Sequence, residues 1–557
     1  MKVDLGALQA SLAATFVDEW VRAGVRDAVA APGSRSAPLT LALAADDRIR
    51  LHVHLDERAA GFFCLGLALA SGRPAVVVTT SGTAAVELHA AIVEASLAGV
   101  PLIACTADRP PELQHVGAPQ TVDQSHLFGR AVRWFAEVGP AEGVPCGAWR
   151  SLASRLVVEA ARGPVHLNVA FRDPLVGTPG ELPSGRAGGR PWHDAAPRRD
   201  AAVVALPDGF AGRRGVVVAG AGCDATDVLA LARSLSWPVL ADPRSGCRGT
   251  DVSVAAFDGV LRSADAVAAL QPEVVVRAGA PPASKVLSQW LAALPLEVGH
   301  VLVDDGDRWR DPERRAAVRL PAVPSVPAGA EPADASWLAA WQRVEDAAQS
   351  AIDTTLASYG ETPTEPGTLR ALTRDTPAGT TFFVSSSMPI RDIEWFGDPA
   401  STHRVLANRG ANGIDGVVAT ALGVAASDAS APVVAVVGDL AFLYDASALT
   451  WAARRDVDLT IVVVDNGGGG IFSFLPQRAE VDHDRFELLF GTPHGVDVEA
   501  LAALHGIPTV EGVGQRRGQE RGVRLVHVRT ERDANVAVHA ELQAAIAAAA
   551  GAAVPRD

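Results

Sequence analysis

The feature that most constrains the fold is an alternation of short, unbroken apolar runs with longer stretches rich in alanine and leucine. Early in the chain, "AVVVTT" at 75–80 precedes a helix-like stretch at 82–99, and "VPLIACTAD" at 100–108 follows it. The same order returns later, where "VVAVVGD" at 433–439 and "LTIVVVDN" at 459–466 flank another helical stretch. Apolar strands that alternate with helices are typical of parallel sheets covered on both faces. We therefore predict an α/β fold in which each domain is a parallel sheet flanked by helices.

The length of 557 residues exceeds what one hydrophobic core usually serves, so we expect several domains. Two stretches rich in Gly, Pro and Ala, at 184–200 and 321–335, have no apolar period and are predicted linkers. The expected parts are an N-terminal domain at 1–185, a central domain at 200–330 and a C-terminal domain at 336–557.

Composition excludes some classes of function. The net charge of −15 disfavours a general role in nucleic-acid binding. We find no run of 18 apolar residues and no signal-peptide pattern at the N-terminus, so we expect a cytoplasmic protein without membrane insertion. The five cysteines are far apart and are predicted to be buried, reduced thiols rather than disulfides or zinc ligands.

Polar residues follow two successive predicted strands. Gly438 and Asp439 end one strand, and Asn466 ends the next, 27 positions after Asp439 and directly before four glycines. One strand–helix–strand unit fits this interval, so Asp439 and Asn466 should lie side by side at the carboxyl edge of a sheet. Carboxylate and amide oxygens suit Mg²⁺, and glycines let the backbone approach a phosphate. Each motif alone is typical of a turn or helix cap, but together they predict a metal-bound diphosphate site.

Other segments share one resemblance. They are "APGSRSAPLTLALA" at 31–44, "HLDERAAGFFCLGLA" at 54–68, "TADRPPEL" at 106–113, "ANRGANGIDG" at 407–416 and "DNGGGGIFSFLP" at 465–476. Together they resemble the 2-succinyl-5-enolpyruvyl-6-hydroxy-3-cyclohexene-1-carboxylate synthase family, which are thiamine-diphosphate enzymes of menaquinone biosynthesis. The resemblance covers most of the first and third domains and little of the central one. It implies three domains of thiamine-diphosphate-enzyme type: N-terminal pyrimidine-binding, central Rossmann-like, and C-terminal diphosphate- and metal-binding.

The resemblance also implies roles for individual residues. Asp439, Asn466 and the carbonyl of Gly468 would bind Mg²⁺ or Mn²⁺. Glu57 resembles the catalytic glutamate that hydrogen-bonds N1′ of the aminopyrimidine of thiamine diphosphate, although "DER" alone is typical of an exposed acid at a helix start. Further cofactor contacts are implied for Glu57, Ser387, Met388, Ile414, Gly438, Asp439, Leu440, Asn466, Gly468 and Ile471. Asp465 stands where the family usually has a second asparagine, which changes the local charge but not the inferred ligand.

The substrates implied by the resemblance are two dianions, 2-oxoglutarate and isochorismate. The first would lose CO₂ on the cofactor, and the remaining unit would add to isochorismate in a 1,4 sense. The matching substrate contacts are Ser34, Arg35, Arg109, Gln120, Arg391, Arg409, Ile471 and Phe472. An arginine in a loop is most often solvated, but arginines recur here in four separate motif segments, and their planar fork suits carboxylates. The resemblance further implies a homodimer with active sites at the subunit interface, and it leaves a tetramer open.

Two alternatives stay open on the sequence. In the central domain, Gly220-x-Gly222-x-x-Ala225 follows a strand and Asp242 ends the next, a weak match to a nucleotide-binding motif. The runner-up enzyme is therefore another thiamine-diphosphate carboligase, similar to acetolactate synthases that use flavin. A non-catalytic protein with the same fold is the second alternative.

Overall fold

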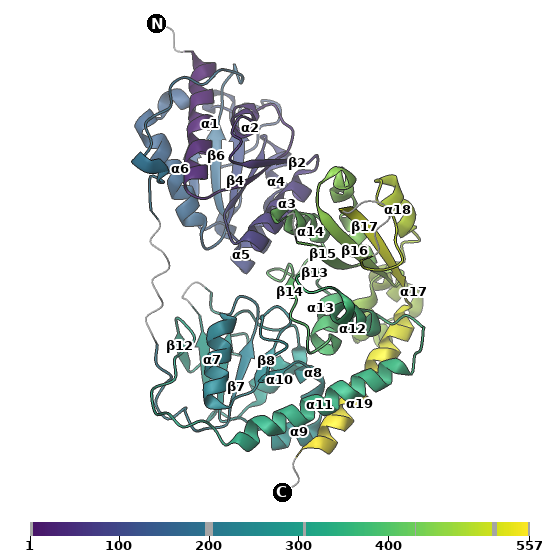
Figure 1. Cartoon of the computed structure of the whole chain (residues 1–557). Helices are drawn as coiled ribbons and strands as arrows, with labels where there is room; N and C mark the ends of the chain where they lie inside the picture. Colours follow the sequence, from purple (N-terminus) through teal and green to yellow (C-terminus); the bar gives the residue numbers. More distant parts are fainter. Residues whose placement is uncertain (1–3, 195–203, 305–307, 429–430, 515–520, 555–557) are drawn as a thin grey trace.

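The computed structural model describes residues 4–194, 204–304, 308–428, 431–514 and 521–554. Three sheets follow one another along the chain, and helices flank each of them (Figure 1). The strand pairs between the named strands are parallel throughout, from the pairing of Asp27 with Arg50 to that of Asp465 with Arg529. The predicted α/β fold with parallel sheets is confirmed.

The N-terminal sheet has the strand order β2-β1-β3-β4-β6-β5. Its strands are β1 (Asp27–Ala30), β2 (Arg50–Val53), β3 (Ala75–Thr79), β4 (Leu102–Asp108), β5 (Phe135–Val138) and β6 (Val165–Ala170). Its helices are α1 (Leu5–Arg22), α2 (Ala37–Ala44), α3 (Glu57–Ser71), α4 (Thr83–Val86), α5 (His89–Ala98) and α6 (Cys146–Ala160). Every residue of β3, β4 and β6 is buried, which explains the apolar runs of β3 and the first half of β4, whereas β6 also carries the buried polar residues His166 and Asn168.

The middle sheet has the order β12-β11-β10-β7-β8-β9. Its strands are β7 (Gly215–Ala219), β8 (Val239–Ala241), β9 (Ser253–Val254), β10 (Val274–Ala278), β11 (Gly299–Val303) and β12 (Val318–Leu320). Its helices are α7 (Ala225–Leu235), α8 (Phe257–Val260), α9 (Ala264–Ala269) and α10 (Lys285–Ala293).

The C-terminal sheet has the order β14-β13-β15-β16-β17. Its strands are β13 (Thr381–Val384), β14 (Arg404–Leu406), β15 (Val433–Gly438), β16 (Asp458–Asp465) and β17 (Gly522–Arg529). The helices of this part are α11 (Ala335–Ala357), α12 (Glu365–Asp375), α13 (Met388–Phe396), α14 (Val417–Ser427), α15 (Asp439–Tyr444), α16 (Gln477–Glu480), α17 (His483–Phe486), α18 (Val498–Leu504) and α19 (Arg532–Ala553).

Helices α3 and α14 join the first and third parts of the chain. A Cβ on Gly66 of α3 would lie 2.1 Å from the Thr420 carbonyl oxygen, and a Cβ on Gly423 of α14 would lie 2.1 Å from that of Phe63. The two helices therefore pack backbone against backbone, which glycine alone permits. A second contact between these two parts is an ion pair: the Arg58 guanidinium lies 3.0 Å from the carboxylate of Asp445, the residue after α15.

The long helices α11 and α19 lie side by side along the middle part (Figure 1). Trp341 of α11 and Leu542 and Ile546 of α19 belong to the same buried cluster as the middle strands. Among the described helices, α19 alone is long and apolar enough to cross a membrane. Leu542 and Ile546 of this helix, however, are buried against the core of the middle part. Each sheet lies within one predicted domain range, whereas the exact boundaries stay a prediction.

The structure differs from the sequence expectations in details. The helical stretch at 82–99 is divided into α4 and α5, and the helical stretch before β16 consists of α15 and short 3₁₀ turns. The expectation of buried cysteines is wrong for Cys146, which is exposed at the start of α6, and Cys223 is half-buried. The predicted linker at 184–200 lies outside the described residues from position 195 onward, and the one at 321–335 is irregular until α11 begins.

Candidate active site

Asp439 and Asn466 follow the ends of two adjacent strands. Gly438 pairs with Val464 in the parallel register of β15 and β16, so the two strands end at the same edge of the sheet. The predicted placement of both residues at this carboxyl edge is confirmed.

The Asp439 carboxylate is held by backbone donors. It is only 3 % exposed; one oxygen accepts from the Leu440 N–H at 2.7 Å and the other from the Gly468 N–H at 2.7 Å. Burial raises the pKa of Asp439, while these N–H groups and His494 oppose the shift. A buried carboxylate with so few charged partners is a suitable site for a cation.

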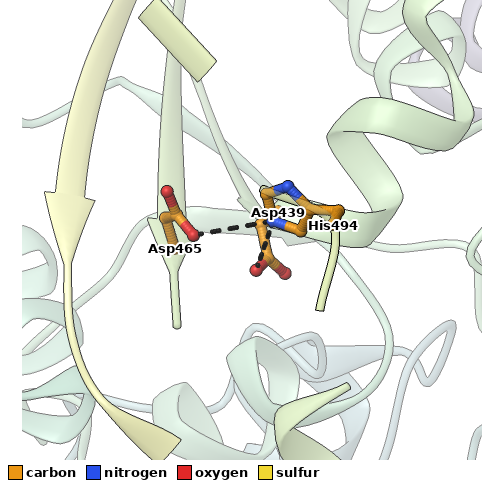
Figure 2. A group of neighbouring side chains, drawn as sticks. All are labelled: Asp439, Asp465 and His494. Carbon is orange, nitrogen blue, oxygen red and sulfur yellow. Dashed lines mark hydrogen bonds and ion pairs between the residues drawn. The ribbon is translucent and has the colours of Figure 1, made fainter. Parts of the chain in front are cut away.

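His494 brings a third side chain that the sequence did not predict. Its Nε2 lies 3.2 Å from Asp439 Oδ2 and 3.9 Å from Asp465 Oδ1, and Figure 2 shows the imidazole joined to both carboxylates. Ligand atoms of the three residues lie within 4.8 Å of one another. His494 is in a loop 55 residues after Asp439, and no spacing in the sequence indicates the contact.

Asn466 presents an unpaired oxygen. Its Nδ2 donates to Glu365 Oε1 at 2.9 Å, whereas its Oδ1 is buried and has no hydrogen-bond partner among the described residues. Buried acceptors are normally satisfied, so this oxygen fits a missing ligand. A carboxylate oxygen of Asp439 and the amide oxygen of Asn466 match the oxygen ligands that a divalent cation such as Mg²⁺ prefers.

Two requirements explain the four glycines after Asn466: close packing within the chain at three positions and space for a ligand at the fourth. A Cβ on Gly468 would lie 2.1 Å from the Gly491 carbonyl oxygen, one on Gly469 2.2 Å from that of Phe490, and one on Gly470 2.4 Å from Asn466 Nδ2. Packing within the chain thus already requires glycine at three positions. Gly467, with a φ of 74° and open space where a Cβ would lie, is the glycine that leaves room for a ligand. The Gly468 carbonyl accepts from the Gly470 N–H at 3.0 Å and keeps a second lone pair.

The start of α13 carries the next group of predicted residues. Ser387 stands at the N-cap position of this helix with a φ of 77° and a ψ of −135°, a conformation that residues other than glycine rarely adopt. Met388 is 4 % exposed, and Arg391 donates to the Ser387 carbonyl. Backbone strain of this kind persists where the surroundings fix it and is common at ligand sites.

Arg409 is a second candidate substrate residue of the C-terminal part. Its Nε is buried, and no group in the part of the chain that the structure describes accepts a hydrogen bond from it. Burial lowers the pKa of Arg409 to about 10, and repulsion from Arg244 and Arg391 adds to the shift. Glu394 and Asp242 attract this guanidinium and offset part of the repulsion, and a substrate carboxylate could add a direct partner.

Three further predicted residues are partly accessible. Ile414 is 40 % exposed, and Ile471 and Phe472 are half-buried in a short 3₁₀ turn at 470–474. The Phe472 ring packs against Phe490 with a centroid distance of 5.6 Å. Their exposed apolar surface is available to a ligand.

Glu57 lines a separate cavity of about 510 Å³. It is the first residue of α3, which Asp56 caps by accepting from the Ala59 N–H at 3.1 Å. Burial raises the pKa of Glu57, the direction that favours proton exchange near neutral pH. Gln120 lines the same cavity. The residues around this cavity come from the N-terminal part of the chain: Pro32, Gly33, Asp56, Glu57, Arg58, Thr80, Thr83, Ala84, Glu87 and Gln120.

The predicted arginines of the N-terminal part lie near this cavity. The Arg109 guanidinium donates to Ser81 Oγ at 2.6 Å, and that hydroxyl donates to the Gln120 carbonyl at 3.0 Å. Arg35 is 7 % exposed and donates to the Phe171 carbonyl at 3.0 Å. Burial lowers the pKa of Arg109 and the charge of Arg35 adds to the shift, so the two cations lie close together. Ser34 is exposed.

The glycine motif of the middle part has a different environment. A Cβ on Gly220 would lie 1.6 Å from the Ala280 carbonyl oxygen, so this glycine is required by a neighbouring loop. Asp242 is fully buried, and both of its carboxylate oxygens accept from the Arg244 guanidinium, at 3.0 and 2.5 Å. Asp242, the acid that would bind the ribose of a nucleotide in the predicted motif, is therefore already paired with Arg244.

Comparison with known families gives three matches along the chain. Residues 10–127 match the thiamine pyrophosphate enzyme N-terminal TPP binding domain, and residues 396–524 match the corresponding C-terminal TPP binding domain. Residues 187–384 match the middle domain of thiamine pyrophosphate enzymes.

Curated relatives are similar over nearly the whole length. A 2-succinyl-5-enolpyruvyl-6-hydroxy-3-cyclohexene-1-carboxylate synthase from Thermobifida fusca is 45% identical, over 97% of this chain and 99% of its own. Proteins of the same name from Chloroflexus aurantiacus and Myxococcus xanthus are 42% and 41% identical. The first covers 93% of this chain and 92% of its own, and the second covers 97% of both.

Proposed function

Because the chain belongs to the 2-succinyl-5-enolpyruvyl-6-hydroxy-3-cyclohexene-1-carboxylate synthase family of thiamine pyrophosphate enzymes, we propose that it catalyses that carboligation in menaquinone biosynthesis. In this reaction 2-oxoglutarate loses CO₂, and the remaining four-carbon unit adds to isochorismate in a 1,4 sense. The observation that carries the proposal is the free, buried Oδ1 of Asn466 beside the buried Asp439 carboxylate.

Thiamine diphosphate supplies, when bound, the electron sink that decarboxylation of a 2-oxo acid requires. We propose that Asp439, Asn466 and the Gly468 carbonyl hold its diphosphate through Mg²⁺ or Mn²⁺. Gly467 leaves the backbone open on that side. Ser387, Met388, Ile414, Gly438, Leu440 and Ile471 are the further residues proposed to contact the cofactor.

Glu57 is proposed to hold a proton at N1′ of the aminopyrimidine. Its half-buried position at the start of α3 supports this role, because burial raises the pKa of the carboxyl and favours sharing of the proton. The Glu57→Gln variant should still bind the cofactor, while turnover falls roughly 10²- to 10⁴-fold, the usual contribution of a positioned acid or base. Near-normal turnover would contradict the assigned role.

The substrate carboxylates are proposed to bind four arginines; the Arg35 guanidinium lies 3.8 Å from the exposed Asp173 carboxylate, a contact that a substrate carboxylate could replace. Arg391 and Arg409 approach from the C-terminal part, and Arg35 and Arg109 from the N-terminal part. Ser34 and Gln120 would contact hydroxyl or carboxylate oxygens, and Ile471 and Phe472 would form the apolar wall beside the reacting carbon. Substrate carboxylates would then form charge-assisted hydrogen bonds with these guanidinium groups.

We propose that the minimum active unit is a homodimer and that the protein acts in the cytoplasm; the proposal leaves a tetramer of two such dimers open. The cavity at Glu57 is lined by residues of the N-terminal part, and the α3 backbone is occupied by α14 of its own chain. A second copy would bring its Asp439 site to this cavity. Mixing inactive Glu57→Gln and Asn466→Ala proteins should therefore restore turnover, because each mixed dimer keeps one intact site. No recovery after verified subunit exchange would contradict shared sites.

The test of the function is turnover of 2-oxoglutarate with isochorismate, with and without thiamine diphosphate and Mg²⁺. We expect CO₂ release and a carboligated product when all four components are present. Use of pyruvate instead would favour an acetolactate synthase-like enzyme. Absence of cofactor binding would favour a non-catalytic protein of this fold.

A further inference from the structure

The Asn466 side chain must be held in one of two orientations. An amide has an acceptor end and a donor end, and only the oxygen can bind a metal ion. Because Nδ2 donates to Glu365 Oε1 at 2.9 Å, Oδ1 is the end that remains free. The contact with Glu365 therefore determines which atom of Asn466 is offered to a ligand.

Glu365 is itself fixed by more than one element. It is the first residue of α12, capped by Thr364, and it is 2 % exposed. The Thr530 hydroxyl, just after β17, donates to the same Oε1 at 3.0 Å. The Thr530 N–H in turn donates to the Asp465 carbonyl oxygen at 2.8 Å, at the end of β16. One carboxylate oxygen thus receives donors from the ends of two adjacent strands.

A helix-start acid has a simpler explanation, which does not account for this burial. An acid in the first turn is favourable beside the helix dipole, and an exposed side chain would serve equally well. Burial and the nearby Asp392 carboxylate raise the pKa of Glu365 to about 7, while Asn466, His539 and Thr530 oppose the shift and partly offset the cost of burying this acid. The hydrogen bond that Glu365 accepts from Asn466 suggests a functional reason for burying this acid.

We propose that Glu365 is a positioning residue of the metal–diphosphate site, which holds Asn466 with Oδ1 free for the ion and polarises its amide. This inference rests on the proposed function, because it requires a divalent cation at Asn466. Carboxylates that bond the far end of a metal ligand orient the ligand and strengthen it.

The experiment measures Mn²⁺ affinity in the presence of thiamine diphosphate, with free Mn²⁺ followed by electron paramagnetic resonance. We expect Glu365→Ala to weaken Mn²⁺ binding roughly 10- to 100-fold, the usual effect of losing an outer-shell partner. Glu365→Gln keeps an acceptor but loses the charge, so its loss should be smaller. Turnover of Glu365→Ala should rise toward the wild-type rate when Mn²⁺ is added to saturation.

A matched control is Glu345→Gln. Glu345 is also a buried glutamate, whose carboxylate accepts from the Ala256 N–H at 2.9 Å in the middle part. Its replacement should leave Mn²⁺ affinity unchanged. Thermal melts of the apo proteins separate a folding defect from a binding defect, and Glu365→Gln serves if Glu365→Ala does not fold.

A double-mutant cycle tests whether Glu365 acts through Asn466. In an Asn466→Ala background, Glu365→Gln should cause no further loss of Mn²⁺ affinity. The inference is overturned if the loss persists in that background, or if folded Glu365→Ala and Glu365→Gln proteins bind Mn²⁺ as tightly as wild type. Wild-type protein that binds neither Mn²⁺ nor thiamine diphosphate would instead contradict the proposed function.

Discussion

The middle and C-terminal parts of the molecule each place a glycine-rich turn and an acid at the ends of neighbouring parallel strands. In the middle part, Arg244 pairs with both oxygens of Asp242, and Gly220 is required by contact with the Ala280 carbonyl oxygen. In the C-terminal part, backbone N–H groups hold Asp439, and Asn466 Oδ1 has no partner within the described ranges. The sequence patterns are similar, but only one of the two turns leaves a ligand atom free.

The difference shows that a glycine-rich turn does not by itself indicate a phosphate site. Glycine is needed wherever backbones approach closely, whether the neighbour is a ligand or another loop. What distinguishes the C-terminal turn is a buried acceptor left unpaired, because buried polar groups are normally satisfied within the fold.

The strongest test of the comparison removes the free acceptor. Asn466→Ala deletes the unpaired oxygen, so we expect thiamine diphosphate binding that depends on metal to fall by more than the roughly 100-fold cost of losing an outer-shell partner. Isothermal calorimetry with Mg²⁺ and thiamine diphosphate measures it. Affinity within a few-fold of wild type would contradict the site.

The counterpart in the middle part should affect stability instead of binding. Asp242→Asn removes the carboxylate that is directly paired with the buried Arg244 guanidinium, a loss that typically destabilises a protein by about 3–5 kcal/mol. We expect a lower midpoint of denaturant unfolding with unchanged affinity for thiamine diphosphate once the protein is folded. A loss of cofactor affinity in the folded variant would contradict the distinction between a structural turn in the middle part and a ligand-binding turn in the C-terminal part.

A pair of glycine substitutions sharpens the comparison. Gly468→Ala would place a Cβ 2.1 Å from the Gly491 carbonyl oxygen, so overpacking should cost about 1–3 kcal/mol and disturb the metal ligands. Gly222→Ala meets open space and bears only the strain of a φ of 76°, about 1–2 kcal/mol. Unfolding and Mn²⁺ titrations of both proteins should show a binding defect in Gly468→Ala alone.

The same distinction between paired and free groups applies to His54, three residues before Glu57. Burial lowers the pKa of His54 to about 2, and Arg455, 2.7 Å from His54 Nε2, adds to the shift. A folded-state pKa below the unfolded value of about 6.5 means that its stability contribution is present above that pH and is lost on acidification, by ~1.4 kcal/mol per unit. His54→Gln should therefore lose less stability than wild type between about pH 6.5 and pH 5 in denaturant unfolding. Equal losses would show that His54 titrates freely.

Much of this arrangement could be predicted from the sequence because it depends on local order along the chain. The interval between Asp439 and Asn466 fits one strand–helix–strand unit, which puts both residues at one sheet edge. His494 and Glu365 could not be predicted, because they reach the site from loops and helices 55 and 101 residues away from their partners. The pairing of Asp242 with Arg244 spans two residues, yet the sequence does not reveal whether such an arginine turns inward or toward solvent.

The most direct test of the account is the position of the metal ion. Crystals grown with thiamine diphosphate and Mn²⁺ would locate the ion by its anomalous scattering. The account predicts a peak within direct coordination distance of an Asp439 carboxylate oxygen and Asn466 Oδ1. A peak elsewhere, or one with Asn466 turned so that Nδ2 faces the ion's position, would contradict it.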